Sequence, residues 1–313
     1  MTDDVSPAEW PRIRRGNPFE EHTVGRRYEH EWGRTVTDAD NVLFTTATVG
    51  YNPRYLDAEA ARAAGHPSAQ INPLVVWATV FGISCEDLSE IAGPFLGGEE
   101  LRYGVPVYAG DTLTASSSVI DARESSSNPS RGIVTWETVG VNQRGERVVS
   151  YRRTNLVAKD SGDFRQPLEG YAEDFVVGDR FRHSRSKTVG ADLEMGLLTP
   201  MLMNAVEGHF SDGAMAATPF GGRINFGGMT LSLTIGLATQ DTTQHATGEV
   251  GLDGISFPAS VRSGDTIATS TEVLAVEDRG TVADVTFRHY GTNQDGVIVC
   301  RVDRIVTIAK RPV

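Results

Sequence analysis

Residues 72–83 read NPLVVWATVFGI, and this stretch decides the fold of the half of the chain that contains it. Asn72 is suited to cap the start of a helix, and Pro73 suits the first helical position because it has no N–H that needs a partner. The residues that follow are apolar on nearly every side, which predicts a buried helix. Residues 229–238 are expected to form the corresponding helix later in the chain.

Segments of alternating polarity follow each helix and predict an antiparallel meander. The expected strands are 111–119, 132–141 and 146–157 in the first half, and 265–276, 281–291 and 297–308 in the second. Polar turns beginning Asn142-Gln143 and Asn293-Gln294 separate the last two strands of each set. Each half is therefore predicted to be an α+β domain whose sheet curls around one helix, since this arrangement buries both.

The two halves share motifs in the same order, 151–154 residues apart. The shared pairs are Thr35-Val36 with Thr188-Val189, Ile71-Asn72 with Ile224-Asn225, Gly110-Asp111-Thr112-Leu113 with Gly264-Asp265-Thr266-Ile267, and Asn142-Gln143 with Asn293-Gln294. Each match is weak alone, but four in order indicate a tandem duplication. Two copies of this length make a doubled domain and not a solenoid.

The length of 313 residues is appropriate for two domains, each with its own core. We expect a leading arm at 1–20, an amino-terminal domain at 21–159, a linker at 160–174 and a carboxy-terminal domain at 175–313.

The composition of the chain argues against several classes of function. The formal charge of −12 and the absence of a long Lys/Arg cluster argue against nucleic acid, although a few arginines can still bind a small anionic ligand. No apolar run is long enough to span a membrane, and the first residues lack a signal pattern, so a cytoplasmic location is expected. Cys85 and Cys300 are expected to be buried reduced thiols, and the histidine spacing predicts no metal site.

These motifs resemble the hotdog fold of the MaoC-like (R)-specific enoyl-CoA hydratases, and the doubling resembles their double-hotdog members. The resemblance covers nearly the whole chain from about His22. It rests on the Gly-Asp-Thr motifs, on the Asn-Gln turns, and on Asn52-Pro53 with Asp57, which looks like a damaged copy of the family's Asp-x-Asn-Pro-x-His motif.

Residues 194–210 resemble more closely the branch that contains mesaconyl-CoA (methylmalyl-CoA) hydratases, in which a His follows an Asn by five residues. The resemblance implies a lyase that reversibly adds water to a 2-enoyl-CoA, with a short, branched or dicarboxylic acyl group. It implies no cofactor apart from the coenzyme A of the substrate.

Aligned on the family motif, the Asp position falls on Gly50 and Asn204, and the His position on Tyr55 and His209. The second half is therefore interpreted as the catalytic half. His209 would be the acid/base, since an imidazole titrates near neutral pH. Asn204 cannot take a proton but can orient the water or the imidazole, and Glu194 or Glu207 could assist. The alternative is a histidine without a catalytic role.

Gly227 and Gly228 begin the helix of the second half. Free amides at a helix start can stabilise the negative oxygen that develops on a thioester, so these glycines are the predicted oxyanion site. The alternative is that they only permit close packing. The first half has Pro73-Leu74 here, and proline has no N–H to offer.

The predicted substrate-binding residues come from both halves. Arg223 could bind a free carboxylate of the acyl group in a two-pronged way, although most arginines simply lie on the surface. Asn225 and Glu194 complete the set in the second half. Arg54 and Tyr55 of the first half would line the acyl pocket, or they are only a retained turn.

Two rival functions stay open. A hotdog thioesterase would use a carboxylate such as Glu194 to hydrolyse the thioester. A non-catalytic module that binds acyl-CoA or an acyl carrier would explain the groups lost from the motif. A homodimer is possible, but a doubled chain already contains the pairing that single-hotdog proteins obtain by dimerising.

Overall fold

The computed structural model describes residues 5–160, 162 and 164–312. The chain divides into two compact units, which are described separately. The amino-terminal unit is Arg15–Gly162, and the carboxy-terminal unit joins Met1–Arg14 to Asp163–Val313.

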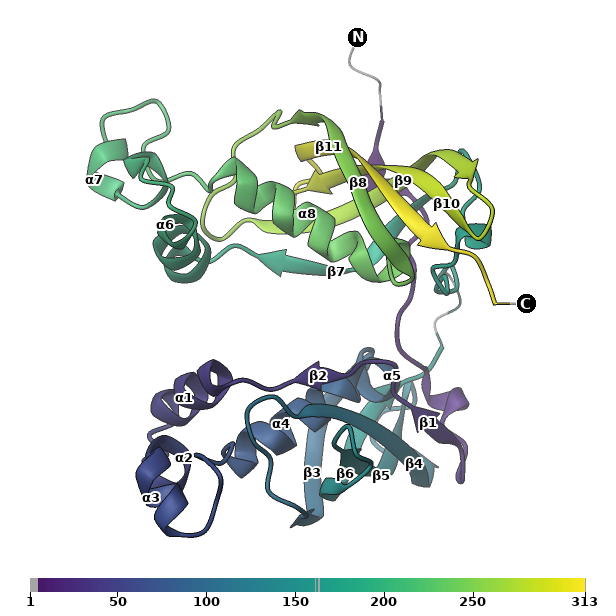
Figure 1. Cartoon of the computed structure of the whole chain (residues 1–313). Coiled ribbons are helices and arrows are strands. Elements are labelled where there is room, and N and C mark those ends of the chain that lie inside the picture. The colour runs from purple at the N-terminus through teal and green to yellow at the C-terminus, as the bar shows by residue number, and fades with distance from the viewer. Residues whose placement is uncertain (1–4, 161, 163, 313) are drawn as a thin grey trace. The chain divides into compact units, whose positions relative to one another are not determined.

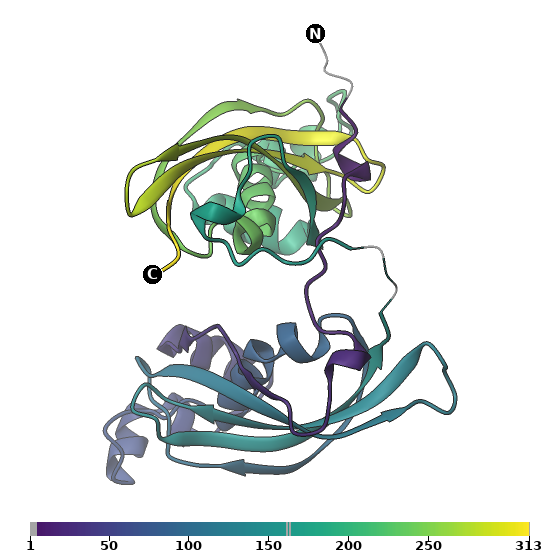
Figure 2. The same ribbon diagram turned by 90° about the vertical axis from the view of Figure 1, so that its right-hand side faces the viewer.

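The amino-terminal unit has a sheet of antiparallel strands in the order β1-β4-β5-β6-β3, with β2 also paired to β4. Figure 2 shows this sheet curving around the central helix α4. Its helices and strands are a 3-10 turn at Phe19–Glu21, β1 (Arg27–Glu29), β2 (Arg34–Thr35), α1 (Asp38–Ala47), α2 (Pro53–Leu56), α3 (Ala58–Ala63), α4 (Pro73–Ile83), α5 (Cys85–Ser89), β3 (Ala92–Tyr103), β4 (Thr112–Glu124), β5 (Arg131–Val141) and β6 (Arg147–Ala158).

The carboxy-terminal unit repeats this plan with the antiparallel order β7-β9-β10-β11-β8 around helix α8 (Figure 1). Its helices and strands are 3-10 turns at Pro7–Glu9, Ala172–Asp174 and Glu207–His209, a π-helix at Ala191–Leu198, α6 (Thr199–Met201), α7 (Asp212–Met215), α8 (Gly227–Thr242), β7 (Arg180–Thr188), β8 (Ala246–Ser256), β9 (Thr266–Asp278), β10 (Val282–Thr292) and β11 (Ile298–Ala309).

The predicted double-hotdog fold is confirmed. The side-chain oxygen of Asn72 accepts a hydrogen bond from the Leu74 N–H over 3.0 Å and caps α4, which begins at Pro73 as expected. The apolar side of α4 packs onto the sheet, with Val75 and Val80 in the core. Within the unit, α4 is nevertheless buried along one side only, because Leu74 remains about half exposed.

Strands β3 and β8 and the helices before the motif were not predicted from the sequence. Both strands lie at an edge of their sheet, and most of their residues are exposed within their own unit. They therefore lack the alternation of polar and apolar residues that marks a half-buried strand. Glycines such as Gly97 and Gly98 in β3 also read as loop residues.

The recurring Gly-Asp-Thr and Asn-Gln motifs form one structural element in each unit. The Gln143 side chain accepts from the Thr112 N–H over 3.0 Å and donates to Asp111 over 2.8 Å. Gln294 makes the same two bonds, to the Thr266 N–H and to Asp265, over 2.9 and 3.0 Å. The turn between the last two strands is thereby fastened to the start of the first long strand of the meander.

The leading arm contributes to the second core. The Ile13 N–H donates to the carbonyl oxygen of Arg182 over 2.8 Å, and the Ser270 hydroxyl donates to the carbonyl of Pro7 over 2.8 Å. Ile13 is fully buried in a cluster that includes Phe181 and Phe287. Residues 5–14 are therefore an integral part of the carboxy-terminal unit.

Both cysteines are free, as expected, but only Cys300 is buried. The prediction of a buried thiol at Cys85 is wrong, because this residue lies just after α4, where the packing against the sheet ends, and is partly exposed. Among the residues that the structure describes, none of the helices has the length and apolar character needed to cross a membrane.

Candidate functional site

A tight left-handed turn places Asn204. Helix α6 ends at Met201, and Met203 has φ of 62°, a value that bulky residues rarely adopt. The Met203 N–H donates to the carbonyl of Pro200 over 2.8 Å, and the Asn204 N–H donates to that of Thr199 over 3.4 Å. This is the Schellman arrangement, which normally has glycine at the left-handed position.

The same turn precedes the motif in the amino-terminal unit. Val49 has φ of 58°, its N–H donates to the carbonyl of Thr46, and the Gly50 N–H donates to that of Thr45 over 2.8 Å. Gly50 and Asn204 are therefore equivalent in structure, as the alignment on the motif predicted.

His209 is held beside the segment that leads into α8. Its Nδ1 atom lies 3.0 Å from the carbonyl oxygen of Ile224. Because a carbonyl oxygen only accepts, Nδ1 carries the hydrogen, and Nε2 of the neutral ring is left with a free lone pair. The ring also packs against Phe226, with 5.5 Å between the ring centroids. The imidazole is thus oriented with its basic nitrogen available.

The first turn of α8 has open donors. The carbonyl of Phe226 accepts from the N–H groups of Met229 and Thr230, and no side chain caps the helix. Among the described residues, nothing accepts from the amides of Gly227 and Gly228. These amides can donate to a ligand oxygen, as the oxyanion prediction requires.

Packing also requires the two glycines. A Cβ on Gly227 would lie 3.1 Å from the Phe257 ring, and one on Gly228 would lie 2.5 Å from the Phe226 ring. The packing interpretation and the oxyanion interpretation are therefore compatible, since the same absence of side chains allows both.

Asn225 lies two residues before α8, and its side chain contacts the first turn of the helix, where Nδ2 donates to the hydroxyl of Thr230 over 3.0 Å. Its Oδ1 is buried and has no hydrogen-bond partner among the described residues. A buried polar atom without a partner is uncommon and requires an explanation.

Asn204 and Glu194 have their own local partners. Oδ1 of Asn204 accepts from the Val206 N–H over 3.0 Å. Glu194 is buried, accepts from the Gly190 N–H over 2.8 Å and pairs with Lys187, whose Nζ is 2.9 Å from its Oε1. Burial by itself would raise the pKa of Glu194, but these bonds outweigh it and hold the pKa below its usual value. Glu194 is therefore a fixed, ionised group.

Arg223 stands two residues before Asn225, and its Nε donates to Oδ1 of Asp212 over 2.9 Å. The Asp212 side chain is largely exposed, so this ion pair lies at the surface and is weak. A carboxylate ligand could compete with it for the guanidinium.

Arg54 and Tyr55 lie in the amino-terminal unit. Nη2 of Arg54 is 3.0 Å from Nε2 of His66, and the carbonyl of Tyr55 accepts from Asn41 over 2.8 Å. Both residues line a cavity of about 180 Å³, together with Gln70 and Tyr103. The retained turn at Asn52-Pro53 thus forms one wall of a pocket.

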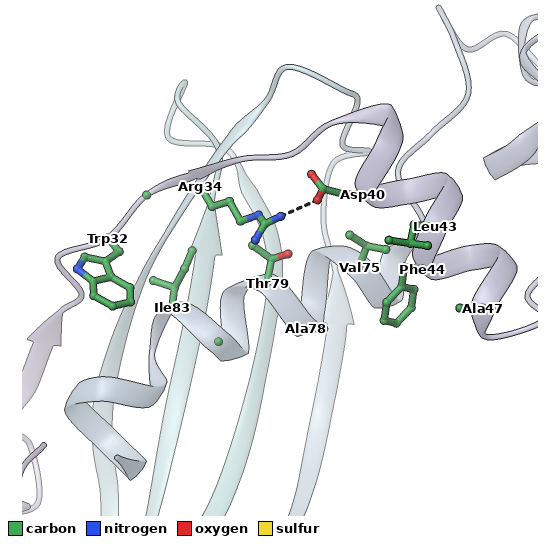
Figure 3. Close-up of a pocket in the computed structure, with 12 residues that line it drawn as sticks. Trp32, Arg34, Asp40, Leu43, Phe44, Ala47, Val75, Ala78, Thr79 and Ile83 are labelled. Carbon is green, nitrogen blue, oxygen red and sulfur yellow. Dashed lines mark hydrogen bonds and ion pairs between the residues drawn. The ribbon is translucent and has the colours of Figure 1, made fainter. Parts of the chain in front are cut away.

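A larger pocket of about 820 Å³ opens between α1 and the outer side of α4 (Figure 3). Its lining is mainly apolar and includes Phe44 and Val75, with the Arg34–Asp40 ion pair beside them. None of the predicted site residues lines it. Its size alone does not make it the catalytic site.

Each unit also contains a histidine–aspartate pair with a buried histidine, which sequence reasoning missed. Nδ1 of His183 lies 2.6 Å from Asp241, and its Nε2 lies 2.7 Å from the Thr271 hydroxyl. His30 makes the equivalent contacts with Asp87 and Ser117, at 2.6 and 2.8 Å. The first pair ties β7 to the end of α8, and the second ties the residue after β1 to α5, the short helix that follows α4. The spacing of 153 residues between the two histidines was the available signal.

Among residues 5–160, 162 and 164–312, no group of three or more His, Cys, Asp or Glu side chains could hold a metal ion. The candidate site combines an imidazole, open amides and a carboxamide around one helix start.

Comparison with known proteins gives a consistent family match. The model of the mesaconyl-CoA hydratase family matches residues 11–162 and again residues 159–310. The chain is 33% identical to the mesaconyl-CoA hydratase of Haloarcula marismortui over 90% of this chain and 87% of that one. It is 29% identical to the β-methylmalyl-CoA dehydratase of Chloroflexus aurantiacus over 83% of this chain and 82% of that one. A solved MaoC domain structure from C. aurantiacus shares 24% identity, with a TM-score of 0.45 over 99% of this chain and 100% of that one.

Proposed function

Because this chain belongs to the mesaconyl-CoA hydratase family, we propose that it hydrates a short, branched or dicarboxylic 2-enoyl-CoA of the mesaconyl-CoA type. The protein is an acyl-CoA hydratase, a hydro-lyase that acts on enoyl thioesters. Coenzyme A is part of its substrate.

His209 would move the proton in this reaction. The water oxygen bonds to Cβ of the enoyl group while Nε2 of His209 takes one water proton. The electron pair of the C=C bond shifts toward the thioester and places negative charge on its oxygen. The protonated imidazole then returns the proton to Cα, so that one water is added in total and the histidine is restored.

The amides of Gly227 and Gly228 would stabilise the negative thioester oxygen. They are pre-positioned by α8 and do not need to be freed from an internal partner. Removing one such donor costs roughly 3 kcal/mol of barrier in other enzymes. Asn204, at the Asp position of the motif, would orient the water or the imidazole through its carboxamide.

The acyl specificity would come from Arg223. Its guanidinium could exchange the exposed Asp212 for a free carboxylate on the acyl group.

The observation that carries this proposal is the bond between His209 and the Ile224 carbonyl, because it leaves Nε2 free on a ring that also contacts Phe226, the residue before α8. The test is to incubate the protein with mesaconyl-CoA and crotonyl-CoA, following the loss of enoyl-thioester absorbance and the product mass. Gain of one water is expected, with mesaconyl-CoA preferred. Turnover of crotonyl-CoA alone would contradict the proposed acyl class.

The same assay separates the two rivals. Release of free coenzyme A would indicate a thioesterase, but Glu194 is held by Lys187 and Gly190 and is poorly placed to serve as its carboxylate. Binding of both thioesters without any product would indicate a binding module.

A further inference from the structure

An asparagine caps α4 and another lies two residues before α8, and the two use their side chains in opposite ways. Oδ1 of Asn72 accepts from the Leu74 N–H over 3.0 Å, and its Nδ2 donates to the Thr45 hydroxyl over 3.1 Å. Asn72 therefore caps α4 with its carboxamide fully satisfied. This is the ordinary structural role of an asparagine at this position.

Asn225 does not cap α8. The hydroxyl of Thr230 faces the carbonyl of Phe226 at 3.5 Å, where it can only donate, so it accepts from Nδ2 of Asn225. This fixes the orientation of the carboxamide and leaves Oδ1 without a partner among the residues that the structure describes, although Asn225 is only 5% exposed. Leaving such a group unpaired typically costs roughly 1–3 kcal/mol.

The loss of the cap opens the helix start. Leu74 and Gly228 are each the second residue of their helix, and the amide that Asn72 satisfies in α4 is open in α8. The first turn of α8 thus offers open donors and one open acceptor together. His209 contacts the residues on both sides of Asn225, through the Ile224 carbonyl and the Phe226 ring.

A ligand that matches this set must bring both an acceptor and a donor. We propose that Asn225 is a catalytic residue whose Oδ1 accepts an O–H of the water that adds to the enoyl-CoA. The second O–H of the same water faces Nε2 of His209, which takes its proton, and the water lone pair is directed at Cβ. Asn225 exchanges no proton, since a carboxamide oxygen serves here only as an acceptor. This inference rests on the proposed function.

The matched pair Asn225→Ala and Asn72→Ala tests it. In Asn225→Ala we expect kcat to fall about 100-fold, the size seen when a pre-positioned polar group is removed, while KM changes less than about threefold. Its unfolding midpoint should fall less than that of Asn72→Ala, because removing an unpaired buried oxygen offsets the loss of the bond from Nδ2 to Thr230. In Asn72→Ala we expect the reverse: kcat close to wild type and a lower unfolding midpoint, because a helix cap is lost.

Asn225→Leu, which keeps the shape and lacks the acceptor, serves if the alanine variant does not fold. Wild-type kcat in a folded Asn225 variant would overturn the inference and leave the proposed function intact. So would a loss of stability equal to that of Asn72→Ala together with a raised KM, which indicates a purely structural role. A wild-type protein that hydrates neither thioester would overturn the proposed function and this inference with it.

Discussion

Nδ1 of His209 donates to the carbonyl oxygen of Ile224 over 3.0 Å, and this single bond decides which nitrogen of the ring can act as a base. The bond also fastens the motif loop to the segment that begins α8, although the two are separated by a run of 15 residues. The orientation of the imidazole is therefore set by backbone and not by a neighbouring carboxylate.

His209→Asn should separate the structural role of Nδ1, which fastens the motif loop to Ile224, from the role of Nε2 as a base. The asparagine amide can replace Nδ1 as donor to Ile224, but nothing replaces Nε2. We expect a folded protein whose kcat is lower by at least about 100-fold, the usual contribution of general acid–base catalysis. Steady-state kinetics with mesaconyl-CoA and a thermal melt check this. Activity within a few-fold of wild type would rule out His209 as the acid/base.

Arg223→Met should change specificity. Loss of a charge-assisted bond to a substrate carboxylate should lower kcat/KM for mesaconyl-CoA by roughly 10- to 100-fold. The value for crotonyl-CoA, which has no free carboxylate, should stay near wild type. Arg279→Met is the control, because Arg279 is also a surface arginine of the carboxy-terminal unit, paired with Glu277 and Asp284. Equal losses for both thioesters would show that Arg223 does not recognise the carboxylate.

Met203→Gly and Val49→Gly should each stabilise the protein. Both positions are left-handed and mostly exposed, so glycine removes backbone strain without losing much packing. Glycine also raises the conformational entropy of the unfolded chain, which offsets part of this gain. A net increase of about 1 kcal/mol in the free energy of unfolding is expected to remain. Alanine at either position should give no such gain, because its Cβ keeps the strain. Denaturant unfolding measures all four variants.

The amino-terminal unit should lose stability in acid through His22. Burial lowers the pKa of His22 from its usual 6.5 to about 4. The unfolded chain therefore takes a proton near pH 6.5 that the folded unit resists until about pH 4. The stabilisation is complete above pH 6.5, is lost as the pH falls toward 4, and amounts to roughly 3 kcal/mol.

Hydrogen exchange of strand β5 at pH 7 and pH 4.5 checks this, because Trp136 in that strand packs on His22 with 5.1 Å between the ring centroids. His22→Gln should reduce the difference between the two pH values. An undiminished difference in the variant would assign the acid sensitivity to other groups.

Ile13→Ala should destabilise the carboxy-terminal unit. Truncating a fully buried isoleucine removes apolar contact and leaves a cavity, at a typical cost of 2–5 kcal/mol. Val176→Ala, at an exposed position of the same unit, should have little effect. Chemical denaturation followed by circular dichroism gives both values. Equal stability of Ile13→Ala and wild type would show that the arm does not belong to the core.

The parts of the fold that the sequence predicted are those with local signals. Asn72-Pro73 before an apolar run marks the start of α4, and the Asn-Gln turns mark the hairpins in both halves. The edge strand β3 has no such signal, because an exposed edge does not require alternation and its glycines resemble a loop.

The candidate site likewise has residues that the sequence could predict and residues that it could not. His209 and the two glycines could be proposed from the sequence because their residue types and their places in the chain suit the chemistry. The open oxygen of Asn225 could not be found, since Asn72 and Asn225 both follow an isoleucine in the sequence, whereas in the fold Asn72 caps α4 and Asn225 lies one residue before the cap of α8. The buried pair of His183 and Asp241 depends on a contact across 58 residues, which no local pattern reveals.

The arm that ends at Arg14 makes the carboxy-terminal unit discontinuous, with the whole of Arg15–Gly162 inserted between its two pieces. During synthesis the segment containing Ile13 leaves the ribosome first, yet its binding site on β7 is made only after the other unit is complete. A fragment that starts at the apparent linker would leave Phe181 and Phe287 without the side chain that covers them. Cutting this protein into its two repeats therefore requires that the first residues be grafted onto the second.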